Sequence, residues 1–182
     1  MPSTDEELVA RALAQRDQAA YGELVRRHQS RVRNWLRQLT RNAATADDIA
    51  QEAFITAWEK LASFGGQGKF GSWLMKIAYN EFLMAYRKGR STDRLASAIE
   101  AEITDDAVHD PAGEQSVAAD LERLLAVLNA DERAVMILCY AQGMSHSEAS
   151  DITGLPVGTV KSHITRGKEK IRLRFFPQGA PT

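Results

Sequence analysis

A segment near the C-terminal end of the chain carries side chains that could read the major groove of DNA. Short hydroxyls and one arginine recur there on one face of a predicted helix: Thr159, Ser162, Thr165 and Arg166. Hydroxyl and guanidinium groups can hydrogen-bond to base edges and phosphates without steric excess. Apolar residues occupy the opposite face, which we expect to be buried: Val157, Val160, Ile164 and Ile171. We therefore predict a recognition helix; the alternative is a helical hairpin with a solvated face.

The residues before this helix predict the rest of a helix-turn-helix. Ser145 and Glu148 have the spacing of a capping box, so a helix should begin there. Gly154 stands where a helix end needs a left-handed residue. Pro156 suits the first turn of the helix that follows.

A second candidate surface lies on the helix predicted over residues 47–61. Asp47 and Asp48 are expected in its first turn, after a break at 42–46. Its alanines face inward, and an isoleucine and a tryptophan edge stand among polar groups on the other side: Asp48, Gln51, Glu52, Ile55, Trp58 and Glu59. Apolar anchors with a polar rim are typical of a protein-docking surface. One alternative is a solvated helix. Another is a metal site of Asp47, Asp48 and Glu52, although no histidine or further acid has the spacing to complete the set of ligands.

A third candidate surface lies on the helix predicted from Phe70 to about Arg87. Its outer face combines aromatic rings, cations and an amide: Lys76, Tyr79, Asn80, Tyr86 and Arg87. Rings beside cations suit unstacked single-stranded bases, which stack on the rings while the cations hold the backbone. In the alternative, the tyrosines complete a wider core. Glu81 falls on the apolar side of this helix, where the sequence offers no explanation for it.

Helices must position all three surfaces, because no strand-like alternation occurs and apolar residues recur at helical spacing. We predict an all-α chain of two small helical domains, over residues 1–87 and 116–177. Residues 88–115 lack strong helical periodicity and contain Pro111 and Gly113, so we assign them to a flexible acidic linker. Residues 178–182 form a tail.

Charge is distributed unevenly, although the net charge is only −1. Residues 26–46 carry six arginines and no acid, and residues 161–174 carry six basic residues against Glu169. Lys168 and Lys170 lie late in the second run, where phosphate contacts are expected. Residues 91–120 hold eight acids and one base. This order suggests two phosphate-facing modules joined by a tether that DNA repels.

Several classes of protein are disfavoured by what the sequence lacks. The single Cys139 excludes a disulfide framework and a thiolate zinc site within the chain. No secretory signal or membrane-spanning run is present, so we expect a cytoplasmic protein. A nucleophile elbow, a glycine-rich phosphate loop and metal-ligand spacing are also missing. We therefore expect no enzymatic activity, no metal and no cofactor.

Together these motifs resemble those of a known family. Residues 47–54 (DDIAQEAF) and 70–80 (FGSWLMKIAYN) are similar to region 2 of bacterial sigma factors, and residues 158–163 (GTVKSH) are similar to region 4. The length of the chain and its organisation in two domains resemble those of the extracytoplasmic-function (ECF) class. The resemblance implies an alternative sigma factor that binds core RNA polymerase and directs promoter recognition and transcription initiation.

The resemblance also implies a role for each surface. A docking face would bind the coiled coil of the polymerase β′ subunit: Asp48, Gln51, Glu52, Ile55 and Trp58. A strand face would capture the melted strand of the −10 element: Phe64, Lys69, Lys76, Tyr79 and Asn80. A groove face would read the −35 element: Thr159, Lys161, Ser162, His163, Thr165 and Arg166. Met84 departs from the family's usual Asp near that position, which leaves the detailed −10 contacts open.

The implied partners are core RNA polymerase through its β′ and β subunits, promoter DNA and an anti-sigma factor, with no membrane insertion. A different hypothesis is a stand-alone transcriptional regulator with a LuxR-like output helix-turn-helix and a ligand-sensing first domain. It accounts equally well for the last third of the chain. It does not explain the exposed Ile55 or the cations and aromatic rings of the strand face. An enzyme that uses the clustered carboxylates is a third hypothesis, without a motif to support it.

Overall fold

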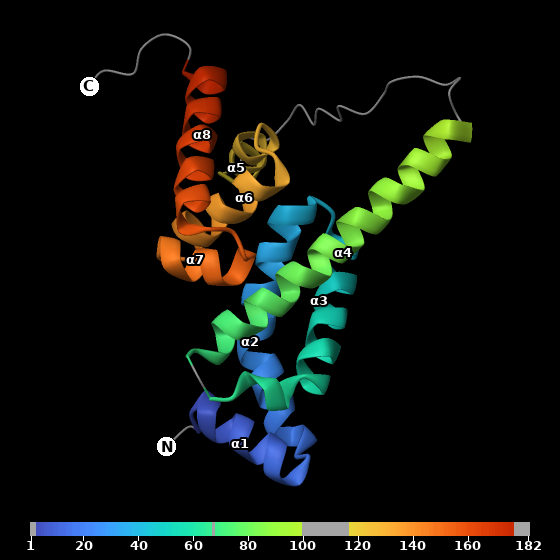
Figure 1. The fold of residues 1–182 in the computed structure, drawn as a ribbon, viewed down its shortest axis with the longest axis vertical. Coiled ribbons are helices and arrows are strands. Elements are labelled where there is room, and N and C mark those ends of the chain that lie inside the picture. Colours follow the sequence, from blue (N-terminus) through green and yellow to red (C-terminus); the bar gives the residue numbers. More distant parts are fainter. Residues whose placement is uncertain (1–2, 67, 100–116, 177–182) are drawn as a thin grey trace.

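The computed structural model describes residues 3–66, 68–99 and 117–176, and within these ranges it contains helices and no strands (Figure 1). The predicted all-α fold is confirmed. The helices are α1 (Asp5–Gln15), α2 (Gln18–Thr40), α3 (Ala43–Glu59), α4 (Phe70–Ile99), α5 (Val117–Ala126), α6 (Ala130–Met136), α7 (His146–Thr153) and α8 (Val157–Phe175). A 3-10 turn, η1 (Leu61–Phe64), follows α3, and a π-helical turn, η2 (Ile137–Ala141), follows α6.

Helices α1 to α4 form a first body around α3. The inner face of α3 is lined by alanines that are fully buried: Ala46, Ala50, Ala53 and Ala57. Because alanine side chains are short, α2 and α4 can both pack closely against this helix. Larger apolar side chains from α2 and α4, such as Leu36 and Leu74, fill the space on either side.

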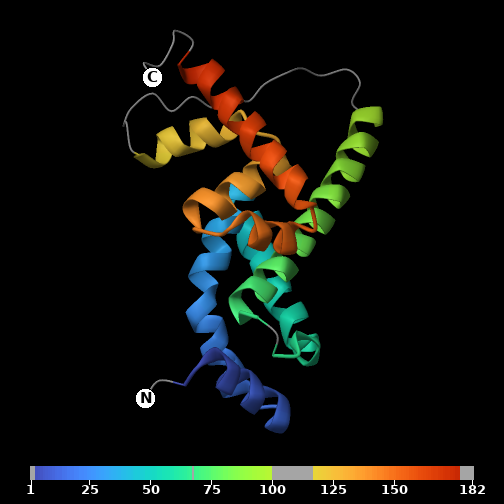
Figure 2. The same cartoon turned by 60° about the vertical axis from the view of Figure 1, so that its left-hand side comes forward.

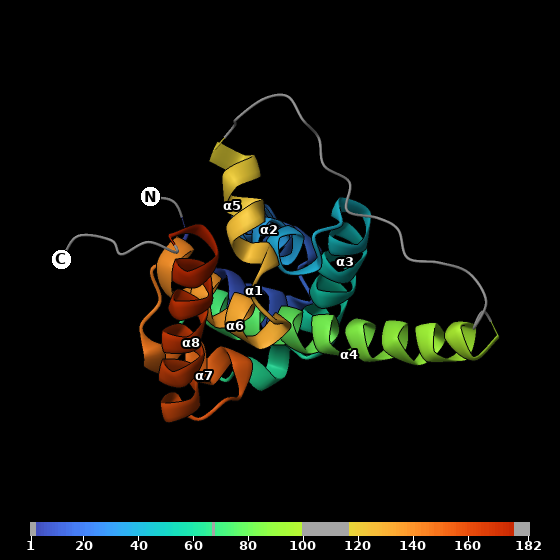
Figure 3. The ribbon, with the colours of Figure 1, turned by 90° about the horizontal axis from the view of Figure 1, so that it is seen from above.

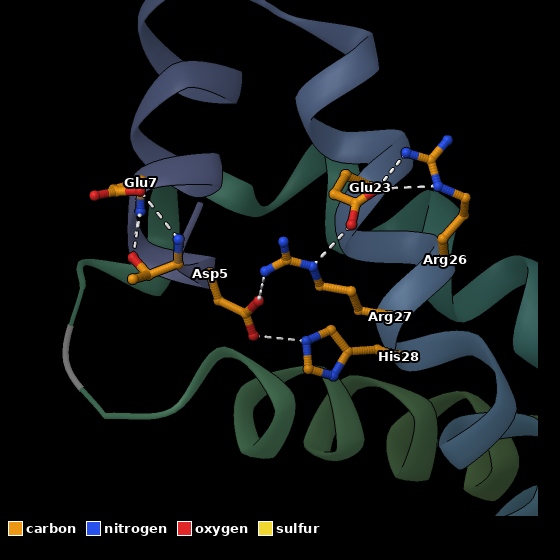
Figure 4. A network of polar contacts seen from close by, with 7 residues as sticks. Asp5, Glu7, Glu23, Arg26, Arg27 and His28 are labelled. Carbon is orange, nitrogen blue, oxygen red and sulfur yellow. Dashed lines mark hydrogen bonds and ion pairs between the residues drawn. The ribbon is translucent and has the colours of Figure 1, made fainter. Parts of the chain in front are cut away.

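The N-terminal helix is tied to α2 by a polar network, and a histidine of this network packs on the start of α4 (Figure 4). A capping box of Thr4 and Glu7 begins α1. Asp5 then accepts a hydrogen bond from Arg27 at 3.1 Å and lies 2.7 Å from Nε2 of His28. The ring of His28 packs so closely on Gly71 that a Cβ there would lie 3.2 Å from it. This packing holds the N-terminal end of α4, where the loop after η1 ends.

Two helix boundaries of the first body differ from the sequence prediction. The side chain of Asn42 caps α3, which begins at Ala43, so Asp47 and Asp48 lie beyond its first turn. Asp47 instead accepts hydrogen bonds from Arg37 on α2. Helix α4 continues to Ile99, so the predicted linker is helical at its start, and residues 100–115 lie outside the described ranges. No proline interrupts residues 88–99, and an established helix propagates through one glycine at modest cost.

Helices α5 to α8 form a second body that contains the predicted helix-turn-helix. Capping boxes begin α6 at Asn129 and α7 at Ser145, and Gly154 ends α7 with a φ of 73°. Helix α8 packs on α6 and α7. Pro156 is the residue before α8 rather than within its first turn. Val157 is 39% exposed, contrary to the prediction, because the tight turn leaves the start of α8 uncovered.

The two bodies are in contact. Helix α7 packs along α4, and α6 approaches α2; Figures 1 and 2 both show α7, in orange, against the first half of α4, in green. In Figure 3, seen from above, the C-terminal half of α4 extends away from both bodies. The described part of the chain is therefore a closed arrangement in which one face of α4 is covered.

Candidate protein and nucleic-acid interfaces

The docking face lies on the outer side of α3, as predicted. Asp48, Gln51 and Glu52 are exposed, and Ile55 is 45% exposed although it is fully apolar. The ring of Trp58 is half-buried, with its centroid 4.8 Å from that of Tyr21. The alanines that pack inward and the side chains of the docking face therefore divide α3 into two opposite sides.

Ile55 borders a groove of about 540 Å³ between α2 and α3. The groove is lined by Gln18, Tyr21, Val25, Arg33, Gln51, Phe54, Ile55 and Trp58. The α2 wall was missed by sequence reasoning. Tyr21 and Val25 follow the same helical spacing as the buried Leu24, so the pattern alone assigns them to the core. Burial raises the pKa of Tyr21, so its phenol stays neutral and suits an apolar wall.

The strand face is divided between exposed and buried residues. Lys69, Lys76 and Asn80 are exposed, whereas Tyr79 is 2% exposed and Phe64 is 4% exposed. Tyr79 stacks between Trp35 and Phe82, with ring centroids 5.8 and 5.9 Å away. The prediction that Tyr79 faces outward is therefore wrong for this closed arrangement. A helical wheel places Tyr79 next to Lys76 but does not show that α2 and the second body cover it.

Phe64 packs in an aromatic cluster at the end of η1. Its ring lies 5.7 Å from Phe70 in an edge-to-face arrangement and 5.5 Å from Trp73. The burial of Phe64 contradicts a direct role in contacting DNA. The ring instead supports the loop that leads to Lys69.

The structure accounts for Glu81, which the sequence left unexplained. The hydroxyl of Thr56 on α3 donates a hydrogen bond of 2.9 Å to Oε1 of Glu81, which links α3 to α4. Met84, which replaces the family's usual Asp, is 53% exposed on the outer surface of α4. The substitution therefore changes the surface of α4 and not its packing.

The groove face on α8 presents four of its predicted side chains to solvent: Lys161, Ser162, Thr165 and Arg166. Thr159 is half-buried. The hydroxyls of Ser162 and Thr165 donate to carbonyls one turn earlier, at 2.9 and 3.1 Å. Their lone pairs remain able to accept hydrogen bonds from base edges.

His163 was predicted to face DNA, but the structure buries it. It lies three residues after Val160 and four before Gly167, which are both buried on the side of α8 that packs against the rest of the second body. This spacing is the pattern that could have corrected the prediction. A Cβ at Gly167 would lie 3.3 Å from Leu128 and Met136, so the inner side of α8 is closely packed there.

Lys170 was predicted to contact phosphate, but it forms an ion pair with a buried acid. Its Nζ lies 2.7 Å from Oε2 of Glu132, which is 1% exposed. The same oxygen accepts the backbone N–H of Asn129 at 3.1 Å. Burial alone would raise the pKa of Glu132, but Lys170 and the N–H of Asn129 outweigh burial and hold that pKa below its usual value. Glu132 therefore links the start of α6 to α8.

Two further findings bear on the classes of protein considered. Among the described residues, no group of three His, Cys, Asp or Glu side chains could hold a metal ion. In the same part of the chain, no helix has both the length and the apolar character needed to cross a membrane.

Two family models match the chain in order. The model of sigma-70 region 2 matches residues 24–92, and that of sigma-70 region 4 matches residues 118–171. These ranges include the docking, strand and groove faces. A stand-alone regulator would not require the first match, so that hypothesis is not favoured.

Individual relatives extend the similarity to nearly the whole chain. The RNA polymerase sigma factor NccH of Alcaligenes xylosoxydans xylosoxydans is 37% identical over 176 residues, which cover 93% of this chain and 94% of that protein. The ECF RNA polymerase sigma-E factor of Haemophilus influenzae is 34% identical over 187 residues, which cover 96% of both chains. The sigma factor RpoE of Bartonella quintana, solved with the anti-sigma factor NepR, is 26% identical with a TM-score of 0.68, and the match covers 86% of this chain and 98% of that one.

Because these matches include both bodies in their order along the chain, the protein belongs to the ECF class of RNA polymerase sigma factors, and it is an alternative sigma factor that binds core RNA polymerase and directs promoter recognition and transcription initiation.

Proposed function

We propose that the three faces divide the work of initiation between them. The docking face on α3 binds the β′ coiled coil, the strand face on α4 captures the melted −10 strand, and the groove face on α8 reads the −35 element. In this proposal residues 1–87 form the polymerase-binding and melting domain, and residues 116–177 form the −35 domain. The observation that carries it is the exposed Ile55 beside an apolar groove on an otherwise polar helix face.

The side chains proposed to contact the −10 strand differ in their exposure. Lys76 and Asn80 are exposed on α4 and can meet the strand directly. The ring of Tyr79 is stacked between Trp35 and Phe82 of the first body, so Tyr79 can offer the strand only its hydroxyl, once Asp131 no longer accepts from it. For the −35 contacts we propose Thr159, Lys161, Ser162, Thr165 and Arg166, and we leave out the buried His163.

We also propose an anti-sigma factor as a partner, because the similar sigma factor of Bartonella quintana was solved with one. The finer expectations from the sequence remain part of this proposal: action in the cytoplasm, a contact with the polymerase β subunit, and no enzymatic activity of the chain itself.

The test of the proposed function is reconstitution. The full chain is mixed with core RNA polymerase, the complex is isolated by gel filtration, and transcription from a library of genomic promoter fragments is measured. We expect co-elution and transcription from a defined subset of fragments. Co-elution without selective transcription would contradict the promoter-reading role.

A first prediction separates base contacts from phosphate contacts on α8. Arg166 is exposed on the groove face. Further along the helix, Nζ of Lys168 lies 5.1 Å from the centroid of the Tyr140 ring. We expect Arg166→Ala in the holoenzyme to lower promoter affinity by about 1–3 kcal/mol in a way that depends on the −35 sequence. Lys168→Ala should weaken all promoters alike and reduce the salt dependence by about one unit of slope. Equal effects of Arg166→Ala on matched and scrambled −35 elements would contradict the assignment.

A second prediction concerns the melted strand. Lys76→Ala and Asn80→Ala should reduce open-complex formation without weakening core binding, because both side chains are exposed on the strand face and lie outside the docking face. Permanganate footprinting of the promoter bubble measures this effect. Tyr79→Ala is unsuitable for the same test, because loss of a buried ring between Trp35 and Phe82 would cost about 3–5 kcal/mol of stability. If both exposed variants open promoters as well as the parent chain does, α4 does not hold the strand.

A further inference from the structure

Two carboxylates of the second body contact side chains of the strand face. The hydroxyl of Tyr79 donates to Oδ1 of Asp131 on α6, at 3.3 Å. Nζ of Lys69 lies 3.7 Å from Oε1 of Glu148 on α7. Both partners belong to the second body, and both contacts engage side chains that the proposed function assigns to the −10 strand.

Two further contacts hold the bodies together at the edges of this interface. Arg133 on α6 donates to the carbonyl of Leu39 at 3.0 Å, in the last turn of α2. The carbonyls of a last helical turn lack partners within the helix, and a cation is favoured beside them. Arg31 on α2 donates to the side chain of Gln142 at 2.8 Å and to its carbonyl at 3.3 Å.

Two of the polar contacts between the bodies add little to the stability of the closed arrangement. Arg31 and Lys69 are exposed, and such pairs contribute little individually. The groove face, by contrast, is exposed in the closed arrangement, so closure leaves the proposed −35 contacts accessible.

We propose that the free chain rests in a closed state in which Asp131 and Glu148 engage the Tyr79 hydroxyl and the Lys69 ammonium group and thereby keep these two groups from the promoter strand. This inference rests on the proposed assignment of α4 to the −10 strand. A DNA strand and the second body compete for the same two side chains, so only one of them can be bound at a time. Engagement of the strand by all of the proposed −10 side chains therefore requires the two bodies to separate first, whereas binding of duplex DNA at α8 does not.

The closed state can be trapped chemically in the unmodified chain. A carbodiimide forms an amide between a lysine and a carboxylate in contact, without a spacer, and the distance between Lys69 and Glu148 suits this reaction. We expect a cross-linked Lys69–Glu148 peptide by mass spectrometry of the free full-length chain. The yield should fall when the chain is bound in the holoenzyme at a promoter. Absence of the cross-link in the free chain would overturn the proposal.

Variants that open the interface test whether closure controls strand binding. Asp131→Ala combined with Gln142→Ala removes one partner from each of two contacts and changes no residue of the strand face. With a fluorescent random single-stranded 12-mer as the probe, we expect about fivefold tighter binding than for the parent chain and a lower cross-link yield. Asp151→Ala is the matched control, because it removes an exposed acid from α7 and leaves the four contacts named above unchanged. Equal affinity of the double variant and this control would overturn the proposal even if the cross-link forms.

The failure of this inference is distinguishable from a failure of the proposed −10 site. Lys76→Ala is added to the open double variant, and binding of the same 12-mer is measured again. A loss of affinity places the strand on α4. Unchanged affinity, with the Lys69–Glu148 cross-link still formed in the parent chain, would show that the bodies close but that α4 is not the strand site.

Discussion

Ile55→Arg is expected to weaken binding to core RNA polymerase by about 2–4 kcal/mol, because it places a charge where the docking face has its apolar anchor. The side chain is 45% exposed in the free chain, so its replacement should leave the fold intact. A cation buried against an apolar partner surface loses its hydration and gains no compensating pair. Affinity is measured by titrating labelled chain with core polymerase at constant salt.

The matched control for Ile55→Arg is Leu13→Arg. Leu13 is 44% exposed on α1, so the control introduces the same charge at a similarly exposed apolar residue outside the docking face. Glu52→Lys on the docking face should weaken binding as well, with a strong dependence on salt. If Ile55→Arg and Leu13→Arg bind core polymerase equally well, the docking face lies elsewhere on the first body.

Lys170→Met is expected to destabilise the second body by about 2–3 kcal/mol at neutral pH, since it removes the partner of a buried carboxylate. The figure is at the low end for a broken buried pair because the side chain of Lys170 is itself 44% exposed. The free energy of unfolding is measured by chemical denaturation, with hydrogen exchange to localise the effect. Lys168→Met, two residues away on the same helix, loses only a contact with the exposed Tyr140 ring and should cost about 1 kcal/mol or less.

The pH dependence of this loss has a definite sign. In the parent chain Lys170 holds the pKa of Glu132 below its ordinary value of 4.5, so the pair stabilises the fold above that pH and loses its effect as pH falls through the folded pKa. In Lys170→Met the ion pair is absent, so the pKa of Glu132 rises above its value in the parent chain. The variant's deficit should then be largest at neutral pH and shrink as the pH falls through the folded pKa values of the variant and the parent chain. A deficit independent of pH would mean that packing, and not the ion pair, is lost.

A double variant separates charge from packing. Glu132→Gln with Lys170→Met removes both charges and keeps an amide that can accept the N–H of Asn129. It should recover part of the stability that Lys170→Met loses. If the double variant is as unstable as Lys170→Met, the buried carboxylate is not the cause of the loss.

The sequence by itself determined the local features whose causes lie within a few residues. The capping box at Ser145 and the left-handed end at Gly154 depend on short-range geometry, so their residue types were sufficient to predict them. The same holds for the two sides of α3, because inward alanines and an outward Ile55 recur at helical spacing. Family resemblance then supplied what the faces do, which periodicity alone could not.

Tertiary structure decided which outward-looking side chains are covered. A helical wheel assigns Tyr79, His163 and Lys170 each to one side of its own helix. Whether that side is buried depends on what packs against it. Tyr79 is sealed by Trp35 of α2 and by Asp131, which lies fifty-two residues further along the chain. Lys170 meets a carboxylate thirty-eight residues away. Spacing along the chain carries no information on such distant partners, because they are brought together only when the helices pack.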